Sequence, residues 1–355
     1  MIDYFSTFFF ESFCVINDDI WMSARDYNGL FKGNLKNGDL QFIGCFPEES
    51  PLKQRLHYGK AIYKNEKIYF IPLESKFLHV YNMNTHLIEF YSIGKKVNRC
   101  YASAVCSNNE IYMISTRTTE LLKYHIDNDL FEFLDSSSFQ SNVKFGYFHG
   151  YYFYNNDLFL SLSQKNILRR INVLDNQITD YFIGEKSYLY QIVAGKEDII
   201  YLINKDKPEV ICWNISHQKV IDVINLEYGI LLNSWQYGNI VLGNAHLNEG
   251  ITVLNLSNLK ADKIFIQNSK KIYNNTGYEI QNSFIYNDDI YIVWEGDGGI
   301  YSLKEKKEIL RFSINNNELK ELKDEMQCHL GKLSENVLEE SDVFNLNDLI
   351  AFVKK

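Results

Sequence analysis

Short apolar segments recur along the whole chain, and each follows a tight turn of Asn, Asp, Glu or Gly residues. Seven apolar pairs align in this way, at intervals of roughly 40 to 50 residues. They are Ile20-Trp21, Ile68-Tyr69, Ile111-Tyr112, Leu158-Phe159, Ile200-Tyr201, Ile240-Val241 and Ile290-Tyr291. Because such a turn followed by apolar residues is typical of a β-hairpin, each pair predicts the beginning of a strand.

A second apolar strand follows each pair and ends about twelve residues later, which keeps the units in register. We expect it at residues 30–35, 78–83, 121–126, 168–173, 210–215, 251–256 and 310–314. A further strand is expected at 40–43, 87–91, 130–134, 177–182, 220–224, 263–266 and 318–322, and an earlier one is visible at 58–63 and 101–105. Each unit therefore predicts a four-stranded antiparallel blade, and the seven units predict an all-β fold, a seven-bladed β-propeller.

The blades are expected near residues 8–46, 57–93, 100–135, 145–183, 188–224, 230–266 and 278–322, so that residues 1–322 form the propeller. The last blade is longer by about nine residues, because the stretch 295–299 and an extra strand at 300–303 are expected to form a hairpin over one face. Two ways of closing the ring stay open. Residues 2–5 add an outer strand to the last blade, or the first and last blades pack face to face.

Residues 323–355 change to a helical period and predict a helical C-terminal tail. Met326, Leu330, Leu333 and Val337 form one apolar stripe, and a second short helix is expected to begin at Asn345 or Asn347. We expect this tail to pack on the propeller. The alternative is that its stripe docks a partner.

The spacing of the strands resembles that of Kelch and galactose-oxidase-like propellers, in which an apolar strand, a loop, a second strand ending in an aromatic residue and a turn recur. The resemblance covers roughly residues 8–322. The double glycine that closes the second strand of Kelch repeats is absent, and Ile71-Pro72, Ser115-Thr116 and Asn204-Lys205 stand in its place. The Trp-Asp ending of WD repeats is absent as well. The resemblance thus implies an architecture, and no functional residue is transferred with it.

Composition excludes several classes of partner. A net charge of −9 and a pI near 5.5 argue against binding of a nucleic-acid backbone.

The apolar patch near the beginning contains Asp3 and Glu11 and has no basic region, so we expect no signal peptide. The sequence contains no run of eighteen apolar residues, so we expect no membrane-spanning helix. The six cysteines show no metal-type spacing, and we expect free thiols in a reducing compartment. These features favour a soluble cytoplasmic protein, monomeric or weakly oligomeric.

One face of the disc is expected to carry a site. The hairpin turns on the other face are uniformly short, whereas the loops between second and third strands and the connections between blades vary in length and chemistry. Polar and aromatic residues on these loops and at the beginnings of first strands are candidate ligand contacts. They are Arg25, Tyr58, Glu74, Tyr101, Arg117, Gln164, Lys205, Trp235, His246 and Glu295.

The sequence contains no convergent catalytic motif. The eight His are scattered without HExxH spacing, and no phosphate-binding glycine loop or nucleophile elbow is present. We therefore expect a non-catalytic binding propeller that recognises a peptide, a protein partner or a glycan, with no cofactor or metal. The alternative is an enzyme at the central funnel, of the sugar mutarotase, lyase, cyclase or glycosidase type, in which Glu74 and Glu295 act as acid and base.

Overall fold

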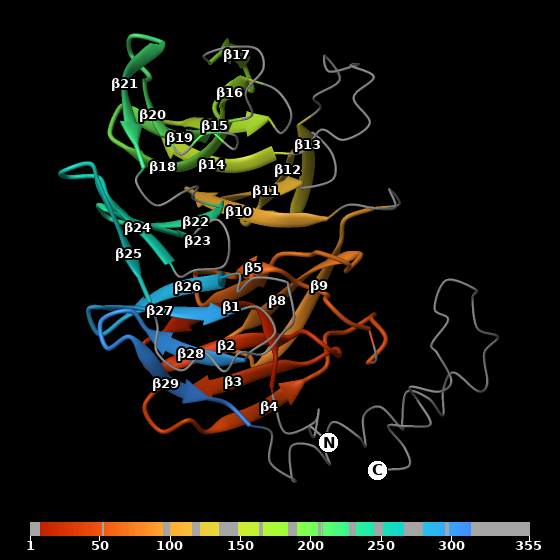
Figure 1. Ribbon diagram of the computed structural model, residues 1–355. Coiled ribbons are helices and arrows are strands. Elements are labelled where there is room, and N and C mark those ends of the chain that lie inside the picture. Colours follow the sequence, from red (N-terminus) through yellow and green to blue (C-terminus); the bar gives the residue numbers. More distant parts are fainter. Residues whose placement is uncertain are drawn as a thin grey trace, which may run out of the picture.

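The computed structural model describes residues 8–51, 53–94, 100–115, 121–134, 148–162, 166–183, 190–204, 207, 209–226, 232–244, 251–265, 280–294 and 298–313. They form seven sheets with four antiparallel strands each, arranged as the blades of a propeller, and one of the sheets gains a fifth, parallel strand (Figure 1). The predicted fold class is confirmed. Within each blade the four antiparallel strands pair in chain order, so each blade is a meander joined by short turns.

The strands of the first four blades have the following bounds. Blade 1 contains β1 (Phe10–Ile16), β2 (Asp19–Ala24), β3 (Leu30–Asn34) and β4 (Leu40–Gly44), with β5 (Gly59–Lys60) added in parallel beside β1. Blade 2 contains β6 (Ile62–Lys64), β7 (Lys67–Phe70), β8 (Phe77–Asn82) and β9 (Leu87–Ser92). Blade 3 contains β10 (Tyr101–Ser107), β11 (Glu110–Ser115), β12 (Leu121–His125) and β13 (Leu130–Leu134). Blade 4 contains β14 (Phe148–Tyr154), β15 (Asp157–Leu162), β16 (Ile167–Asn172) and β17 (Ile178–Phe182).

The other three blades complete the ring. Blade 5 contains β18 (Tyr190–Lys196), β19 (Ile199–Asn204), β20 (Glu209–Asn214) and β21 (Lys219–Asn225). Blade 6 contains β22 (Leu232–Tyr237), β23 (Ile240–Asn244), β24 (Ile251–Asn255) and β25 (Lys260–Ile264). Blade 7 contains β26 (Ile280–Tyr286), β27 (Asp289–Trp294), β28 (Gly299–Ser302) and β29 (Lys307–Arg311).

The first hairpin of each blade turns where the sequence predicts it. Left-handed backbone conformations occur at Asn17, Asn65, Asn108, Asn155, Glu197, Gly238 and Asn287, each at the turn between the first two strands of its blade. Two-residue hairpins need positive φ angles, which Asn, Asp and Gly adopt at low cost. The residue types at these turns therefore determine where the first hairpin of each blade occurs along the chain.

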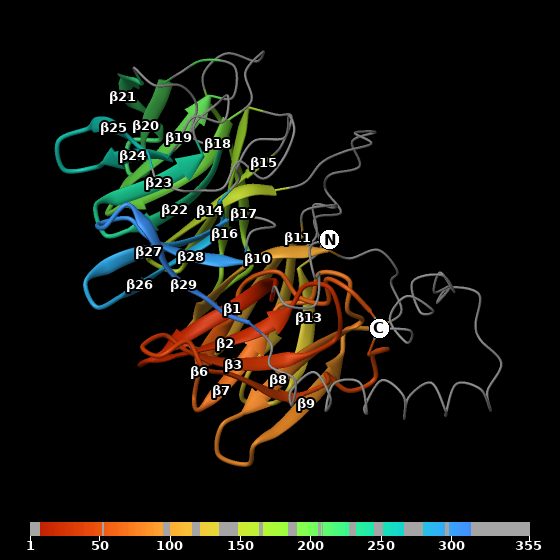
Figure 2. The same ribbon diagram turned by 60° about the horizontal axis from the view of Figure 1, so that its bottom comes forward.

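Seven apolar clusters hold the blades together, and each lies between two neighbours. They join blades 1 and 2, 2 and 3, 3 and 4, 4 and 5, 5 and 6, 6 and 7, and finally 7 and 1. The ring is therefore closed by side-chain packing on every side. The turned view in Figure 2 shows the strands of blade 7 beside those of blades 1 and 6.

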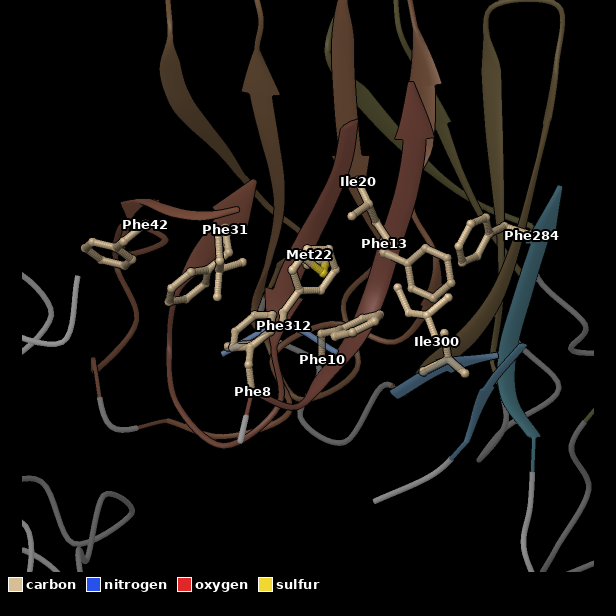
Figure 3. Close-up of a cluster of buried hydrophobic side chains, with 13 residues drawn as sticks. Phe8, Phe10, Phe13, Ile20, Met22, Phe31, Phe42, Phe284, Ile300 and Phe312 are labelled. Atoms are coloured by element: carbon tan, nitrogen blue, oxygen red, sulfur yellow. The ribbon is translucent and has the colours of Figure 1, made fainter. Parts of the chain in front are cut away.

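The seam between blades 7 and 1 is rich in phenylalanine. Phe8, Phe13 and Phe31 of blade 1 share a cluster with Phe284 and with Phe312, which follows blade 7 (Figure 3). The rings of Phe13 and Phe284 meet edge to face, 5.5 Å apart between centroids. Gly33 leaves room for this packing, because a Cβ atom there would lie 2.5 Å from the Phe312 ring. Among the described residues, closure thus rests on face-to-face packing, and the alternative outer strand at residues 2–5 lies outside them.

The strand assignment in blade 7 corrects the sequence analysis. Its third and fourth strands are β28 and β29, and not residues 310–314 and 318–322. The segment 300–303, expected as an extra hairpin over one face, largely coincides with β28 and belongs to the regular third strand. The turn between β28 and β29 is made of Lys and Glu, with Lys306 in the left-handed region, so it lacks the usual turn residues. Residues 318–322 and the expected helical tail at 323–355 lie outside the described part of the chain.

Candidate functional site

The first strand of each blade is the innermost one, except that β5 takes this place beside blade 2. The strands β14, β18, β22, β26, β1, β5 and β10 contact one another in this order around the axis, and Figure 1 shows them on the inner side of their blades. Each runs from the face with the variable loops toward the face with the tight hairpins. The candidate face is therefore the one at which the inner strands begin.

A β-bulge interrupts the first strand near its beginning in every blade except the second. In blade 2 the strand is divided instead, and β5 pairs with β1 of blade 1. The inserted residue is Glu11 in β1 and Gln281 in β26. Bulges redirect side chains, and these two place polar groups at the mouth of the ring.

The carboxylate of Glu11 lies between two guanidinium groups, and we call Glu11, Arg25 and Arg55 the arginine cluster. Nε of Arg55 lies 3.0 Å from Oε1 and donates a hydrogen bond to Oε2 at 3.1 Å. Nε of Arg25 lies 3.6 Å from Oε1. The Glu11 side chain is 1% exposed, whereas those of Arg25 and Arg55 are 26% and 45% exposed. A buried carboxylate thus holds two arginines at the surface.

Backbone hydrogen bonds bring the segments of the arginine cluster together. The N–H of Arg25 donates to the carbonyl of Phe9 at 2.9 Å, and the N–H of Arg55 donates to the carbonyl of Arg25 at 2.8 Å. The N–H of Glu74 in turn donates to the carbonyl of Arg55 at 3.3 Å. Loops of blades 1 and 2 and the connection between them therefore meet at this point.

The connection between blades 1 and 2, residues 45–58, is fixed from both sides. The buried side chain of Asn28 donates to the carbonyls of Phe46 and Glu49 at 2.8 and 3.1 Å, and accepts from the N–H of Phe46 at 2.8 Å. The Glu49 carboxylate accepts from the Ser75 hydroxyl at 2.8 Å and the Lys76 N–H at 2.9 Å. Such a scaffold holds Arg55 in place before any ligand arrives.

Asp26 adds a second carboxylate beside the cluster. Its Oδ1 lies 3.8 Å from Nε of Arg25. The Asp26 side chain is 48% exposed, and its partial desolvation raises its pKa, while the charges of Arg25 and Arg55 offset part of this effect. Asp26 therefore holds a proton at higher pH than an ordinary aspartate.

A row of buried polar groups, joined by hydrogen bonds, lies between blades 1 and 2. Ser23 Oγ lies 2.9 Å from His57 Nδ1, His57 Nε2 lies 2.9 Å from His79 Nδ1, and His79 Nε2 lies 3.0 Å from the carbonyl of Pro47. A carbonyl can only accept, so His79 Nε2 donates to it, His57 Nε2 donates to His79 Nδ1, and Ser23 donates to His57 Nδ1. Both imidazoles are neutral in this arrangement, which we call the histidine file.

The structure brings some of the sequence-predicted residues together. Arg25 belongs to the arginine cluster, and Glu74 is exposed in the neighbouring loop of blade 2. Tyr58 is half-buried and directly follows His57 of the histidine file. These three candidates lie on the same side of the ring, around the junction of blades 1 and 2.

Other candidates serve a different role or lie elsewhere. Tyr101 is buried in the cluster between blades 2 and 3, and Trp235 is half-buried against the cluster between blades 6 and 7, so both pack between blades. The remaining candidates, Arg117, Gln164, Lys205, His246 and Glu295, lie outside the described residues.

Sequence reasoning missed Glu11 and Arg55 as site residues. The signal for Glu11 is one carboxylate inside the aromatic run from Phe8 to Phe13, because a charge in a buried strand requires a partner. Arg55 gives no comparable signal, since a charged residue in a connection is usually solvated.

The described residues contain neither a candidate metal site nor a candidate membrane-spanning helix. No group of three or more His, Cys, Asp or Glu side chains gathers there in a way that could hold a metal ion. No helix among them has the length and apolar character that crossing a membrane requires.

Comparison with known proteins gives likenesses of fold. No family model matches the chain, and no curated protein matches it. Virginiamycin B lyase from Staphylococcus aureus is similar in structure at 12% identity and a TM-score of 0.61, over 83% of this chain and 94% of that one. A catalytically inactive variant of that enzyme with quinupristin gives 12% identity and a TM-score of 0.62, over 84% and 94% of the two chains.

A third similar structure is the extracellular domain of a hybrid two-component system, BT4673, from B. thetaiotaomicron. It gives 13% identity and a TM-score of 0.57, over 85% of this chain and 38% of that one. None of these three is a Kelch protein, and at such identities the likeness shows the fold alone. The comparisons therefore support the seven-bladed propeller architecture and leave the ligand to be argued from the site.

Proposed function

We propose that this chain is a binding propeller that recognises a polar ligand with an anionic group, carried by a peptide, a protein partner or a glycan, at the arginine cluster. The observation that carries the proposal is the buried Glu11 carboxylate, which holds the guanidinium groups of Arg25 and Arg55 at the face where the inner strands begin.

Charge and geometry support this proposal. The cluster itself has one carboxylate and two guanidinium groups, with the Asp26 carboxylate beside Arg25, in a chain whose net charge is −9. Guanidinium groups bind carboxylates and phosphates through paired N–H donors, and fixing them in advance reduces the entropy lost on binding. The scaffold around Asn28 and Glu49 supplies that rigidity.

The experiment is a binding screen followed by matched variants. Acidic peptides and glycans would be screened by isothermal titration calorimetry against the full chain, Arg25→Gln and Arg55→Gln. Each variant leaves one guanidinium on Glu11, and each should weaken binding about tenfold or more, since a charge-assisted hydrogen bond contributes roughly 1.5–3 kcal/mol.

Arg311→Gln is the matched control. Arg311 is also half-exposed and paired with a carboxylate, Glu308, but it lies on the outer strand β29. This variant should bind like the wild-type chain. Unchanged affinity in both cluster variants, for every ligand that the wild type binds, would place the binding site elsewhere.

Asp26 favours one alternative function, an enzyme at the funnel that uses proton transfer. Its raised pKa and its position next to Arg25 suit a general acid, and the structural likeness to a lyase is compatible with such chemistry. Turnover of a bound ligand that is lost in Asp26→Asn, with binding retained, would favour the enzyme over the binding module.

A further inference from the structure

Two side-chain amides on β26 are buried without acceptors for their N–H groups. Among the described residues, neither Nε2 of Gln281 nor Nδ2 of Asn282 has a hydrogen-bond partner, and the two residues are 8% and 3% exposed. The amide oxygen of Asn282, by contrast, accepts from the N–H of Ser283 at 2.8 Å. Buried polar groups in proteins almost always have partners, so these donors indicate an acceptor that the described residues do not supply.

The orientation of β26 directs Asn282 toward blade 1. Side chains alternate along a strand, so Asn282 lies on the same side as Phe284, whose ring packs on Phe13 of β1 at 5.5 Å. Ser283 lies on the opposite side, where its hydroxyl is 2.9 Å from the Tyr237 hydroxyl of blade 6. Asn282 thus faces the blade that carries the arginine cluster.

The amides and the arginine cluster lie at the same level of the ring. The far ends of β26 and β1 are joined by a hydrogen bond from the Tyr286 hydroxyl to Asp18 at 2.7 Å, so the two strands run in the same direction. Asn282 precedes Phe284 by two residues, and Glu11 precedes Phe13 by two residues. Gln281 also occupies in β26 the bulge position that Glu11 occupies in β1.

We propose that the beginnings of β26 and β1 form one binding site for a sugar acid. The carboxylate of the sugar pairs with Arg25 and Arg55, and its ring and hydroxyl oxygens accept hydrogen bonds from the amides of Gln281 and Asn282. This inference rests on the proposed function and gives it a ligand class.

The balance of donors and acceptors favours a sugar acid over a peptide. The groups of Gln281 and Asn282 that lack partners among the described residues are N–H donors. Glu11 is an acceptor at the same height along the ring axis, but it is already paired with two guanidinium groups. A peptide brings an N–H for nearly every carbonyl, and each would need an acceptor. A sugar acid offers a carboxylate next to several oxygen acceptors, which complements the site.

The test compares D-glucuronate, D-glucose and N-acetylglycine as probes of the full chain by calorimetry. D-glucuronate should bind, and D-glucose, which lacks the carboxylate, should bind at least about tenfold more weakly. N-acetylglycine keeps a carboxylate but replaces the hydroxyls by an amide, and should also bind more weakly. Gln281→Leu and Asn282→Ala should each weaken D-glucuronate binding about tenfold, as expected for the loss of one hydrogen bond.

A second readout separates a ligand site from a structural role. Gln281→Leu removes a donor that has no partner among the described residues, so the midpoint of thermal unfolding without ligand should stay the same or rise. Ser283→Ala is the matched control on the opposite side of β26. It removes the hydrogen bond to Tyr237 and should lower the midpoint without changing the affinity for D-glucuronate.

The outcomes distinguish this inference from the proposed function. If the amide variants bind D-glucuronate like the wild type, or if ordered waters satisfy both amides and the sugar does not displace them, the sugar-acid site is wrong. If an acidic peptide binds and D-glucuronate does not, the sugar-acid site is wrong while the binding propeller stands. If no anionic probe binds the wild type at all, the sugar-acid site and the proposed binding function are both wrong.

Discussion

Glu11 shows how one buried charge organises the surface above it. Its carboxylate is nearly inaccessible to water, while the two arginines that it holds remain partly exposed. Removing the carboxylate and removing the arginines should therefore lower the stability of the protein to different extents. Without Glu11, both guanidinium groups can still be hydrated, but without the arginines the buried carboxylate loses the two cations that pair with it.

The stability of variants should follow this asymmetry. We expect Glu11→Gln to lower the free energy of unfolding by about 1–2 kcal/mol, and the double variant Arg25→Ala with Arg55→Ala to lower it by roughly 3 kcal/mol or more. Adding Glu11→Gln to the double variant should recover part of the loss. Urea denaturation at neutral pH measures all three. Simple additivity of the losses would show that the three side chains do not act as one cluster.

Residue-level features were only partly predictable from the sequence. Arg25 and Glu74 could be placed on the face where the inner strands begin, because loop position follows from strand order. Glu11 and Gln281 could not, since their position depends on a bulge that no residue type announces. Tyr101 is at the beginning of a first strand, as expected, but its ring turns between the blades and not toward the face.

The connection between blades 1 and 2, residues 45–58, is held by hydrogen bonds from loops of both blades. It carries Arg55 at its surface and closes over the histidine file below. Burial lowers the pKa of His57 well below its usual value and that of His79 to about 4, because neither cation can be solvated there. The Glu49 carboxylate opposes this effect at His79, and the Lys53 ammonium reinforces it at both.

Stability should therefore fall in mild acid. An unfolded histidine binds its proton near pH 6.5, whereas the folded His79 does so only near pH 4. The stability that the neutral His79 contributes is fully present above pH 6.5. It is lost progressively as the pH falls toward 4, because the histidine binds its proton in the unfolded chain before it does so in the folded one. Each histidine that stays neutral in the fold adds a slope of about 1.4 kcal/mol per pH unit in this window.

Urea denaturation at a series of pH values from 7.5 down to 5 would measure this slope. His79→Gln keeps a donor for Pro47 and an acceptor for His57, so it should fold and show a shallower slope. His217→Gln, at an exposed hairpin turn of blade 5, is the control for the loss of a histidine outside the file. An identical slope in wild type and His79→Gln would contradict the assignment.

Element-level prediction succeeded where turn chemistry was explicit. Asn, Asp and Gly mark the first hairpins in all seven blades, and every one of them is found. In blade 7 the last turn consists of Lys and Glu residues, so the strand signal was assigned one strand too late. The histidine file has no sequence signature, because its members come from three separate segments.

Seven equivalent seams hold the molecule together, but one of them differs in its connectivity. Six seams join blades that follow each other along the chain, whereas blades 7 and 1 come from opposite ends of the described chain and are joined by side-chain packing and by the hydrogen bond from the Tyr286 hydroxyl to Asp18. Sequence spacing predicted the number of blades, but closure could not be decided from it, because the facing phenylalanines of the seam come from opposite ends of the chain.

Matched cavities should reveal this difference. Phe284→Ala in the seam of blades 7 and 1, and Phe159→Ala in the seam of blades 4 and 5, each remove a buried ring and should cost about 3–5 kcal/mol. Only Phe284→Ala should also speed amide hydrogen exchange specifically in β1 and β26, since those blades can separate locally. Equal exchange in all blades for both variants would indicate that the ring opens only as a whole.

Phe8 and Phe312 lie in the same apolar cluster, although 304 positions separate them along the chain. The polypeptide therefore enters and leaves the ring at one place. A circular permutant, with residues near 8 and 313 spliced by a short linker and new termini opened between two other blades, would retain all seven seams. The position of the break is thus a free choice for protein engineering, and moving it would place a fused reporter next to any chosen blade.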